Sequence, residues 1–297
     1  MYHQPLLALL ALALSGGTAF GQEACNGSPA LCSRPYGDVT FVASHNAAFV
    51  GRGPAHNQFE YPEAGLSQGV RYFTTQTHIE DGEIRQCHSD CFLLNAGAFS
   101  EILVSLKSWM ERNPREVVTL LVTNGDDDIR VEEFAEVFES TGTTGIVFTP
   151  GNGQKPGMDG WPTLGEMINS GKRLVVFMDY NADPAKVPYI LPQYDYYVET
   201  PFSPTSSNFF NCDVDRPSSG ASADNRMIFA NHNLNLELFA GLLVPDQDSA
   251  AETNSVANIR QQTEICVASF GRAPNVVMLD FVSVGQAIEA QKQLNGL

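Results

Sequence analysis

Two histidines in this 297-residue chain stand where acid–base chemistry would need them. His45 lies in the stretch VASHNAAF (42–49), directly after a strand-like apolar run, and His88 lies in IRQCHSDC (84–91), between two cysteines. Imidazole titrates near neutral pH, so one histidine can accept a proton while a second donates one. The two stretches predict an acid–base pair, provided that the fold brings them together.

Further polar residues follow the other apolar runs of the chain. They are Asn46, Thr74, Gln76, His78, Arg85, Asn124, Asp126–Asp128, Asp179, Glu199, Asn231, His232 and Asp280. Packing of a core does not explain polar residues that gather at one end of each apolar run. In a barrel of parallel strands, catalytic groups lie at the carboxyl ends of the strands, which is where these residues would be.

The elements that must position these residues are short apolar runs that alternate with helical patterns. We predict strands at 39–44, 70–77, 117–123, 145–148, 173–179, 196–199, 227–231 and 276–280. Several are apolar nearly throughout, as strands buried on both faces of a parallel sheet are. We predict helices at 98–114, 130–141, 163–173 and 283–294. Eight strands alternating with helices favour a (β/α)8 barrel of the TIM type, with a doubly wound open sheet as the alternative.

The first 21 residues have the pattern of a secretion signal. The apolar run LLALLALAL (6–14) is too short to span a bilayer, and small residues follow it before Gln22. We predict a signal peptide at 1–21, a cysteine-containing lead at 22–36 and a single domain at 37–297. The mature chain should be secreted and monomeric, without a stable membrane anchor, and the NGS sequon makes Asn26 a candidate for glycosylation.

The six cysteines fit the same compartment, because an even number in a secreted chain is typical of disulfides. Proximity alone suggests a sequential pairing, although fifteen connectivities exist for six cysteines. The pairs would be Cys25–Cys32, Cys87–Cys91 and Cys212–Cys266. A structural zinc site would need four clustered ligands, and no second close pair accompanies Cys87, His88 and Cys91.

The chain is strongly acidic, with 17 basic and 34 acidic residues and a net charge of −17. This charge argues against nucleic acid and against an anionic membrane surface as partners. An anionic ligand would need a positive field that is confined to its site.

Six stretches together resemble one family, the secreted fungal branch of the phosphatidylinositol-phospholipase-C-like phosphodiesterases (the X domain). They are ASHNAAF, GVRYFTTQTH, CHSDCFLLNAG, LKSWMERNPREVVTLLVTN, YYVETPFS and PNVVMLDF, and the resemblance covers most of 37–295. It implies a TIM-type barrel, irregular or incompletely closed. It also implies that the substrate is a phosphodiester small molecule or a lipid head group.

The resemblance assigns roles to three residues. His45 would be the general base that removes a proton from the neighbouring hydroxyl, and His88 the general acid that protonates the leaving alcohol. Asp280, at the end of the last strand, would orient His45. Asn46, Gln76, His78, Arg85, Asn124 and Glu199 are the predicted substrate-binding residues.

The chain departs from the family where a positive charge is needed. Bacterial members carry an Asp and an Arg on the second strand, and animal members carry two acidic calcium ligands there. The matching residues here are Thr74 and Gln76. Calcium prefers several oxygen ligands with carboxylates among them, so these residues disfavour calcium without excluding it, and we expect no other metal and no cofactor. Arg85 and a protonated His78 are the candidates to replace the missing charge.

Two alternatives stay open at this stage. Without a replacement cation, the chain would be a weak enzyme, or a catalytically silent binding protein for a phosphorylated or sugar-like ligand. A glycosidase would instead use a pair of carboxylates, and Asp179 and Glu199 stand at positions that suit one.

Overall fold

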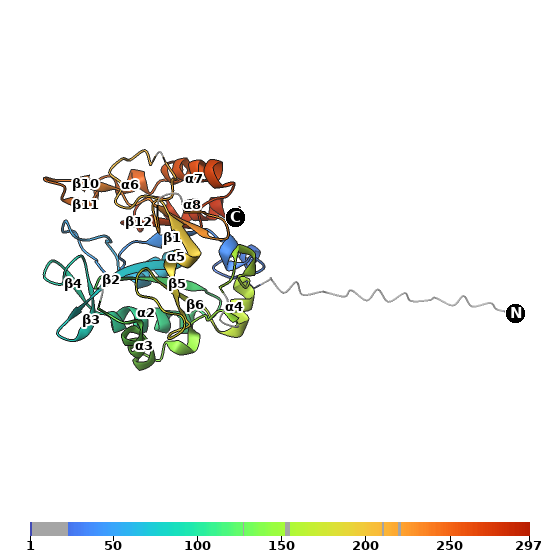
Figure 1. The fold of residues 1–297 in the computed structure, drawn as a ribbon. Helices are drawn as coiled ribbons and strands as arrows, with labels where there is room; N and C mark the ends of the chain where they lie inside the picture. The colour runs from blue at the N-terminus through green and yellow to red at the C-terminus, as the bar shows by residue number, and fades with distance from the viewer. Residues whose placement is uncertain (2–22, 127, 152–154, 210, 219–220) are drawn as a thin grey trace.

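The computed structural model describes residues 1, 23–126, 128–151, 155–209, 211–218 and 221–297. Apart from Met1, the predicted signal peptide therefore lies outside the described residues. Figure 1 shows helices arranged around a central set of strands. The strands are β1 Phe41–Ser44, β2 Tyr72–Glu80, β3 Glu83–Cys87, β4 Asn95–Ala98, β5 Val118–Asn124, β6 Leu174–Met178, β7 Ile190–Pro192, β8 Tyr197–Glu199, β9 Met227–Asn231, β10 Asn235–Glu237, β11 Leu243–Pro245 and β12 Val276–Leu279. The helices are α1 Pro62–Gln68, α2 Phe99–Arg112, α3 Val131–Ser140, α4 Leu164–Ser170, α5 Gln193–Tyr196, α6 Ala250–Thr253, α7 Val256–Phe270 and α8 Ala287–Leu294.

Eight parallel strands form a curled half-barrel, in the order β7-β6-β5-β2-β1-β12-β9-β8. No ladder of the described residues joins β7 to β8, so the barrel is incompletely closed there. The predicted TIM-type architecture is confirmed in this open form. β3 and β4 extend the sheet beside β2 as antiparallel strands, and β10 and β11 form a separate hairpin.

The strands bury both of their faces, which is why their sequences are apolar nearly throughout. One cluster lies inside the barrel and includes Tyr72, Phe177 and Phe229. The other lies between the sheet and the helices and includes Phe73 and Leu120. Because successive side chains of a strand point to opposite faces, both sets of positions must be apolar.

One predicted strand is wrong, and one of the eight parallel strands, β7, was missed, as were the antiparallel strands β3, β4, β10 and β11. The run at 145–148 begins in a short 3-10 turn, and Val147 makes a single bridge to Leu174 at the start of β6. The rest of that edge of β6 pairs with β7. β7 has only three residues and ends in Pro192, so it carries no periodic signal. Helix α7 was also missed, because its buried face includes Gln262 and Thr263.

The cysteine-containing lead packs against the barrel. Leu31 and Tyr36 belong to the inner core cluster, and the Tyr36 hydroxyl lies 2.8 Å from Oγ1 of Thr119 on β5. The Asn26 side chain accepts a hydrogen bond from the backbone of Val117 and donates one back to it. The predicted glycosylation acceptor thus already bonds to the fold through the Nδ2 atom that would carry a sugar.

All three predicted disulfides are present, as Cys25–Cys32, Cys87–Cys91 and Cys212–Cys266. The first closes a turn of the lead, and the second closes the turn that carries His88. The third joins the segment after β8 to helix α7.

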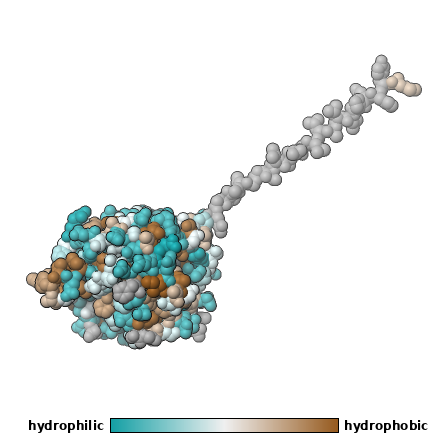
Figure 2. Space-filling model, turned by 90° about the horizontal axis from the view of Figure 1, so that it is seen from above, coloured by the Kyte–Doolittle hydropathy of each residue, from teal (hydrophilic) through white to brown (hydrophobic). Residues whose placement is uncertain are grey.

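The molecular surface has an uneven distribution of apolar side chains. In Figure 2, brown atoms project on the side where the β10–β11 hairpin lies in Figure 1. This hairpin exposes Leu236 and, in its turn, Leu238, Phe239 and Leu242. Within the described ranges, no helix combines the length and the apolar composition that a membrane crossing requires.

Candidate active site

His45 and Asp280 lie side by side because their strands are neighbours in register. β1 and β12 pair in parallel, with Ser44 opposite Leu279. His45 and Asp280 each follow directly on these residues. Nδ1 of His45 lies 2.8 Å from Oδ1 of Asp280. The predicted partnership is therefore a consequence of the register.

The backbone turns sharply after each of these two residues. Asn46 has φ +46° and Phe281 has φ +49°, both in the left-handed region. Asparagine tolerates this region, whereas a bulky aromatic residue is rarely found there. The Phe281 turn is held by a hydrogen bond from its N–H to the carbonyl of Asn57 and by stacking of its ring on Phe59 at 4.5 Å. Strained backbone of this kind often accompanies functional sites.

The contacts of His45 determine which ring nitrogen is free. Asp280 is 5% exposed, and its Oδ1 also accepts a hydrogen bond of 2.8 Å from Nδ2 of Asn57. Asn57 and Asn233 place their Nδ2 atoms 3.2 and 3.5 Å from Nδ1 of His45. Since Asp280 accepts from Nδ1, the neutral ring carries its proton there, and Nε2 is left with a lone pair. His45 is oriented as a general base would be.

His88 lies in the turn after β3, which the Cys87–Cys91 disulfide closes. Its backbone N–H donates to the carbonyl of Leu94, and its ring packs edge-on against Phe49 at 5.2 Å between centroids. Burial lowers the pKa of His88 to about 4, and the nearby charge of His45 contributes to the same shift. The two histidines are thus close enough to influence each other.

Both histidines line one pocket of about 410 Å³ at the carboxyl ends of the strands. Of the predicted residues, the lining contains His45, Asn46, Gln76, His88 and Glu199, together with Thr74. Asp280 is not part of the lining, but it hydrogen-bonds to His45, which is. The side chain of Gln76 accepts a hydrogen bond of 2.7 Å from the backbone of Ser89, which leaves its Nε2 atom as the donor.

Three predicted binding residues do not reach this lining. Asn124 is buried, and its amide donates to the carbonyl of Ile129, while its backbone N–H donates to Oδ1 of Asp179. Asn124 therefore positions Asp179. Neither of the two candidate cations, His78 and Arg85, lies in the lining either.

Both candidate cations are paired with carboxylates outside the pocket. Nδ1 of His78 lies 2.8 Å from Oδ1 of Asp126, and Arg85 contacts Glu83 at 2.8 Å and Glu80 at 3.7 Å. The alternation of β2 does place His78 on the face of Gln76, but by that point the strand has left the barrel and pairs with β3. The expectation that His78 or Arg85 replaces the missing charge is therefore corrected.

Among the described residues, the pocket lining contains one arginine, Arg216, and the sequence did not point to it. Arg216 lies in the irregular segment between β8 and β9, forms an ion pair with buried Glu199 and stands 4.9 Å from the ring centre of Phe202. Gln193 also donates to Glu199. A sequence signal existed only in the RP dipeptide of a loop, which does not point to a site. Asp179 lies near this pair, and burial raises its pKa to about 6.

The pocket therefore has two chemically different ends. One holds the His45–Asp280 pair and His88, and the other holds Glu199, Arg216 and Asp179. A ligand could meet acid–base groups at the first end and charged hydrogen-bonding groups at the second.

The neutral residues near the histidines suit a metal poorly. Asn46, Thr74 and Gln76 offer no carboxylate, and the amide oxygen of Gln76 already accepts a hydrogen bond. Calcium would need a richer set of oxygen ligands. In the described part of the chain, no three His, Cys, Asp or Glu residues are placed to hold a metal ion.

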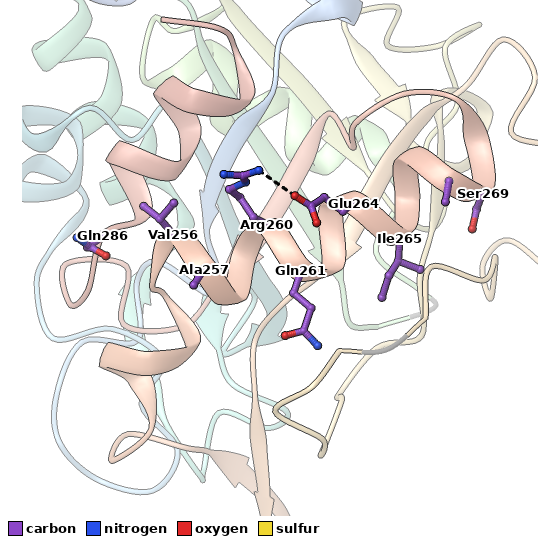
Figure 3. Close-up of a pocket in the computed structure, with 9 residues that line it drawn as sticks. Val256, Ala257, Arg260, Gln261, Glu264, Ile265, Ser269 and Gln286 are labelled. Atoms are coloured by element: carbon purple, nitrogen blue, oxygen red, sulfur yellow. Dashed lines mark hydrogen bonds and ion pairs between the residues drawn. The ribbon is translucent and has the colours of Figure 1, made fainter.

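A second hollow, of about 930 Å³, lies along the exposed face of α7 (Figure 3). Its lining includes Val256, Gln261 and Ile265, and its charged pair is Arg260 with Glu264 at 2.9 Å, one helical turn apart. Such exposed pairs on one helix are solvated surface features. The hollow brings no acid–base pair together, and the smaller pocket is therefore the candidate active site.

Comparisons with known proteins identify the family and agree with the fold. A family model described as PI-PLC X 1 matches residues 31–295. The chain is 41% identical over 278 residues to the PI-PLC X domain-containing protein 1 of Arthroderma benhamiae, covering 92% of this chain and 90% of that protein. It is also 43% identical over 270 residues to a protein of the same fungus named "Uncharacterized secreted protein", covering 88% of this chain and 60% of that protein. The fold is similar to the phosphatidylinositol-specific phospholipase C from Listeria monocytogenes, with a TM-score of 0.60 at 13% identity over 89% of this chain and 95% of that one.

Proposed function

This chain belongs to the PI-PLC X domain family, and we propose that it is a secreted, metal-independent phosphodiesterase that uses His45 and His88 as its acid–base pair. The observation that carries the proposal is the geometry of His45. Asp280 holds its Nδ1, and its Nε2 is left free in a pocket that His88 also lines.

The proposed reaction uses a hydroxyl of the substrate next to its phosphodiester. Nε2 of His45 takes the proton of this hydroxyl, whose oxygen attacks phosphorus. The bond between phosphorus and the leaving alcohol breaks, and the protonated His88 gives its proton to that alcohol. The products are a cyclic phosphodiester and a free alcohol, and water can open the cyclic product with the two histidines in exchanged roles.

The negative charge that develops on the phosphoryl oxygens would meet neutral donors. Gln76 Nε2 and the amides of Asn46 and Asn233 are among the side-chain donors of the lining near the histidines. Hydrogen bonds from neutral groups stabilise such charge less than a cation does, and loss of one charge-stabilising group costs about two to three orders of magnitude in rate. We therefore propose a slow enzyme.

The other end of the pocket would bind the head group. Glu199 and Arg216 together offer an acceptor and several donors, which suit a polyol better than a bare phosphate. Because Glu199 neutralises Arg216, the pair adds little net positive field at the phosphorus. This end would set the specificity of the enzyme.

Secretion is supported by three disulfides and by the name of the second fungal relative. Disulfides form in oxidising compartments, of which the secretory route is the main one. We propose a monomer whose ligand is a small phosphodiester or a lipid head group.

The test is turnover of an inositol phospholipid in mixed micelles and of a soluble aryl phosphodiester that carries a hydroxyl next to its phosphodiester, with and without chelator. We expect activity that resists the chelator and falls at least a hundredfold in His45→Ala and in His88→Ala. His78→Ala is the control, because this histidine lies outside the pocket. Activity that the chelator abolishes, or that survives His45→Ala, would contradict the proposal.

The neutral residues Thr74 and Gln76 also support a second candidate, a binding protein without turnover. A binder needs no cation for a transition state. It would show no turnover of either substrate, together with saturable binding of an inositol phosphate that Glu199→Gln weakens. A glycosidase would instead retain activity in His45→Ala and lose it in Asp179→Asn or Glu199→Gln.

A further inference from the structure

The side-chain amide of Asn26 pairs with both backbone groups of Val117. Its Oδ1 accepts from the N–H of Val117 at 2.7 Å, and its Nδ2 donates to the carbonyl of Val117 at 3.1 Å. The backbone N–H of Asn26 also donates to the carbonyl of Arg115 at 3.2 Å. Val117 is fully buried and directly precedes β5. Asn26 therefore bonds the cysteine-containing lead to the start of a barrel strand through three hydrogen bonds.

Asn26 lies in a small loop that packs against the core. The Cys25–Cys32 disulfide closes this loop, and we call residues 25–32 the lead loop. Cys25 and Leu31 of the loop are buried in the inner core cluster. Displacement of the lead loop from the barrel would break the amide pairing and expose these two core residues to water.

The geometry of the pairing decides which hydrogen of Nδ2 is used. Both partner groups belong to one residue, so the oxygen of the Asn26 amide and the hydrogen that it donates must point to the same side. An amide group is planar, and only one of its two nitrogen-bound hydrogens lies on the side of the oxygen. This hydrogen makes the bond to Val117, and the other points away from it.

A glycan at Asn26 would take the place of this same hydrogen. Asn26 begins the sequon NGS, and the sugar would be attached to Nδ2. The glycosylated amide is a secondary amide, which favours the arrangement with its two carbon substituents trans to each other. The sugar carbon then lies on the side of Oδ1, in the position from which Nδ2 now donates to Val117. The glycosylated side chain therefore cannot make the pairing.

The order of synthesis makes the two uses of Asn26 compete. Val117 follows Asn26 by 91 residues, and chains grow by about 5–20 residues per second, so roughly 5–20 s pass before the pairing can form. Glycosylation in the secretory route can act in this interval. The Cys25–Cys32 disulfide spans only 7 residues, so it can form within the lead and hold Asn26 in its turn, with φ +46°, before β5 exists. Early closure of the lead loop thus favours pairing over glycosylation.

We propose that Asn26 is the latch of the lead loop, and that closure of the loop and N-glycosylation of Asn26 exclude each other. The native, closed protein carries no glycan at this residue. A chain that is glycosylated first keeps its lead loop open, with Cys25 and Leu31 exposed, and has a lower free energy of unfolding. The proposal is independent of the proposed function, because neither the pocket nor its histidines take part in it.

The latch is tested with two variants that both remove the sequon. Asn26→Ala deletes the amide, whereas Ser28→Ala keeps it and removes a hydroxyl that makes an exposed contact of 3.3 Å with the backbone of Ala30. The readout is hydrogen exchange of the Val117 N–H. We expect this exchange to be at least about tenfold faster in Asn26→Ala than in Ser28→Ala. Equal exchange in the two variants would overturn the latch.

The exclusion is tested on the full chain secreted from a eukaryotic host, with glycosylated protein separated on a mannose-binding lectin and its sugars mapped by mass spectrometry. We expect the protein without a glycan at Asn26 to match Ser28→Ala in Val117 exchange and in urea unfolding. Any protein glycosylated at Asn26 should exchange this N–H at least about tenfold faster and unfold at lower urea. A glycan at Asn26 in protein whose Val117 N–H stays protected would overturn the proposal.

The fraction of chains with a glycan at Asn26 tests the competition itself. Cys25→Ser/Cys32→Ser opens the lead loop and leaves the sequon intact. Cys87→Ser/Cys91→Ser is the matched control, because it removes another short disulfide, at the opposite end of the barrel. We expect the glycosylated fraction of the first variant to be at least about five times that of the control, since the restraint on the lead loop is lost. Equal fractions, including no glycan in either variant, would overturn the competition.

Discussion

Nδ1 of His45 lies 2.8 Å from Oδ1 of Asp280, although 235 residues separate the two in sequence. Asn57 donates to the same carboxylate oxygen and so holds it in place. The buried carboxylate fixes both the orientation of the imidazole and the position of its proton. If this arrangement is the catalytic base, its chemistry should depend on the charge of Asp280.

Asp280→Asn should therefore lower kcat/KM about a hundred- to ten-thousandfold on a soluble diester, with little loss of fold. An amide N–H directed at Nδ1 of His45 would favour the wrong tautomer, in which Nε2 carries the proton. Asp126→Asn makes the same chemical change beside His78, which lies outside the pocket, and should leave kcat/KM within about twofold. Equal losses in the two variants would show that the effect of Asp280→Asn is not specific to the site.

The pH dependence should reflect His88. Its pKa is lowered to about 4 by burial and by His45, so in the free protein the protonated acid becomes about tenfold rarer with each pH unit above 4. We expect kcat/KM to be highest below neutrality and to fall as the pH rises towards 8. A profile that still rises between pH 6 and 8 would mean that His88 is not the acid.

The two histidines should also differ in their dependence on the leaving group. A nitrophenol leaves as an anion without a proton, whereas an alkyl alcohol needs one from an acid. His88→Ala should lose at least tenfold less activity on a nitrophenyl diester than on an alkyl diester. His45→Ala should lose about equally on both, because the attacking hydroxyl is the same. The opposite pattern would exchange their roles.

The ionised carboxylate of Asp179 should lower the free energy of unfolding at neutral pH. Burial raises its pKa from 3.8 to about 6, so the folded state disfavours the ionised form. The resulting penalty is absent below pH 3.8, grows between pH 3.8 and 6, and is complete above pH 6. By 1.36 kcal/mol per pKa unit, it amounts to at most about 3 kcal/mol.

Asp179→Asn removes this penalty, and its amide oxygen can still accept the N–H groups of Asn124 and Tyr180. We expect a higher free energy of unfolding at pH 7.5 and little change at pH 3.5, measured by urea denaturation. A gain of the same size at both pH values would rule out ionisation as its cause.

Two of the disulfides should differ in their main effect, one on the stability of the fold and the other on activity. Cys212–Cys266 links residues 54 positions apart, and Cys87–Cys91 links residues 4 apart. Loop entropy predicts stabilisation of about 4 kcal/mol for the long loop and about 2 kcal/mol for the short one. Cys212→Ser/Cys266→Ser should therefore lower the unfolding free energy more.

Cys87→Ser/Cys91→Ser should instead lower kcat more, because His88 lies inside that short loop. Comparison of kcat at a temperature at which both double variants remain folded tests this difference. Equal kcat values would mean that the short disulfide does not position His88.

The amino-acid pattern alone predicted the strands that lead to His45 and Asp280 and favoured a barrel, and proximity suggested the three disulfide pairs that the structure contains. The strand segments are apolar on both faces, and this local pattern can be recognised from the amino-acid sequence alone. Polar residues at strand ends identified His45, His88 and Asp280 as candidates. The family resemblance then assigned their roles.

Which side chains share the pocket depends on how distant segments pack together. The alternation of side chains along β2 places His78 and Gln76 on the same face of the strand. At His78, however, β2 has extended beyond the barrel, and His78 contacts Asp126 and does not line the pocket. Arg216 enters from an irregular loop, where no periodicity predicts a position, and its partner Glu199 lies 17 residues earlier in the printed sequence. The exposure of Phe239 depends on the absence of a packing neighbour. Such facts arise from contacts between distant segments, which local sequence patterns do not encode.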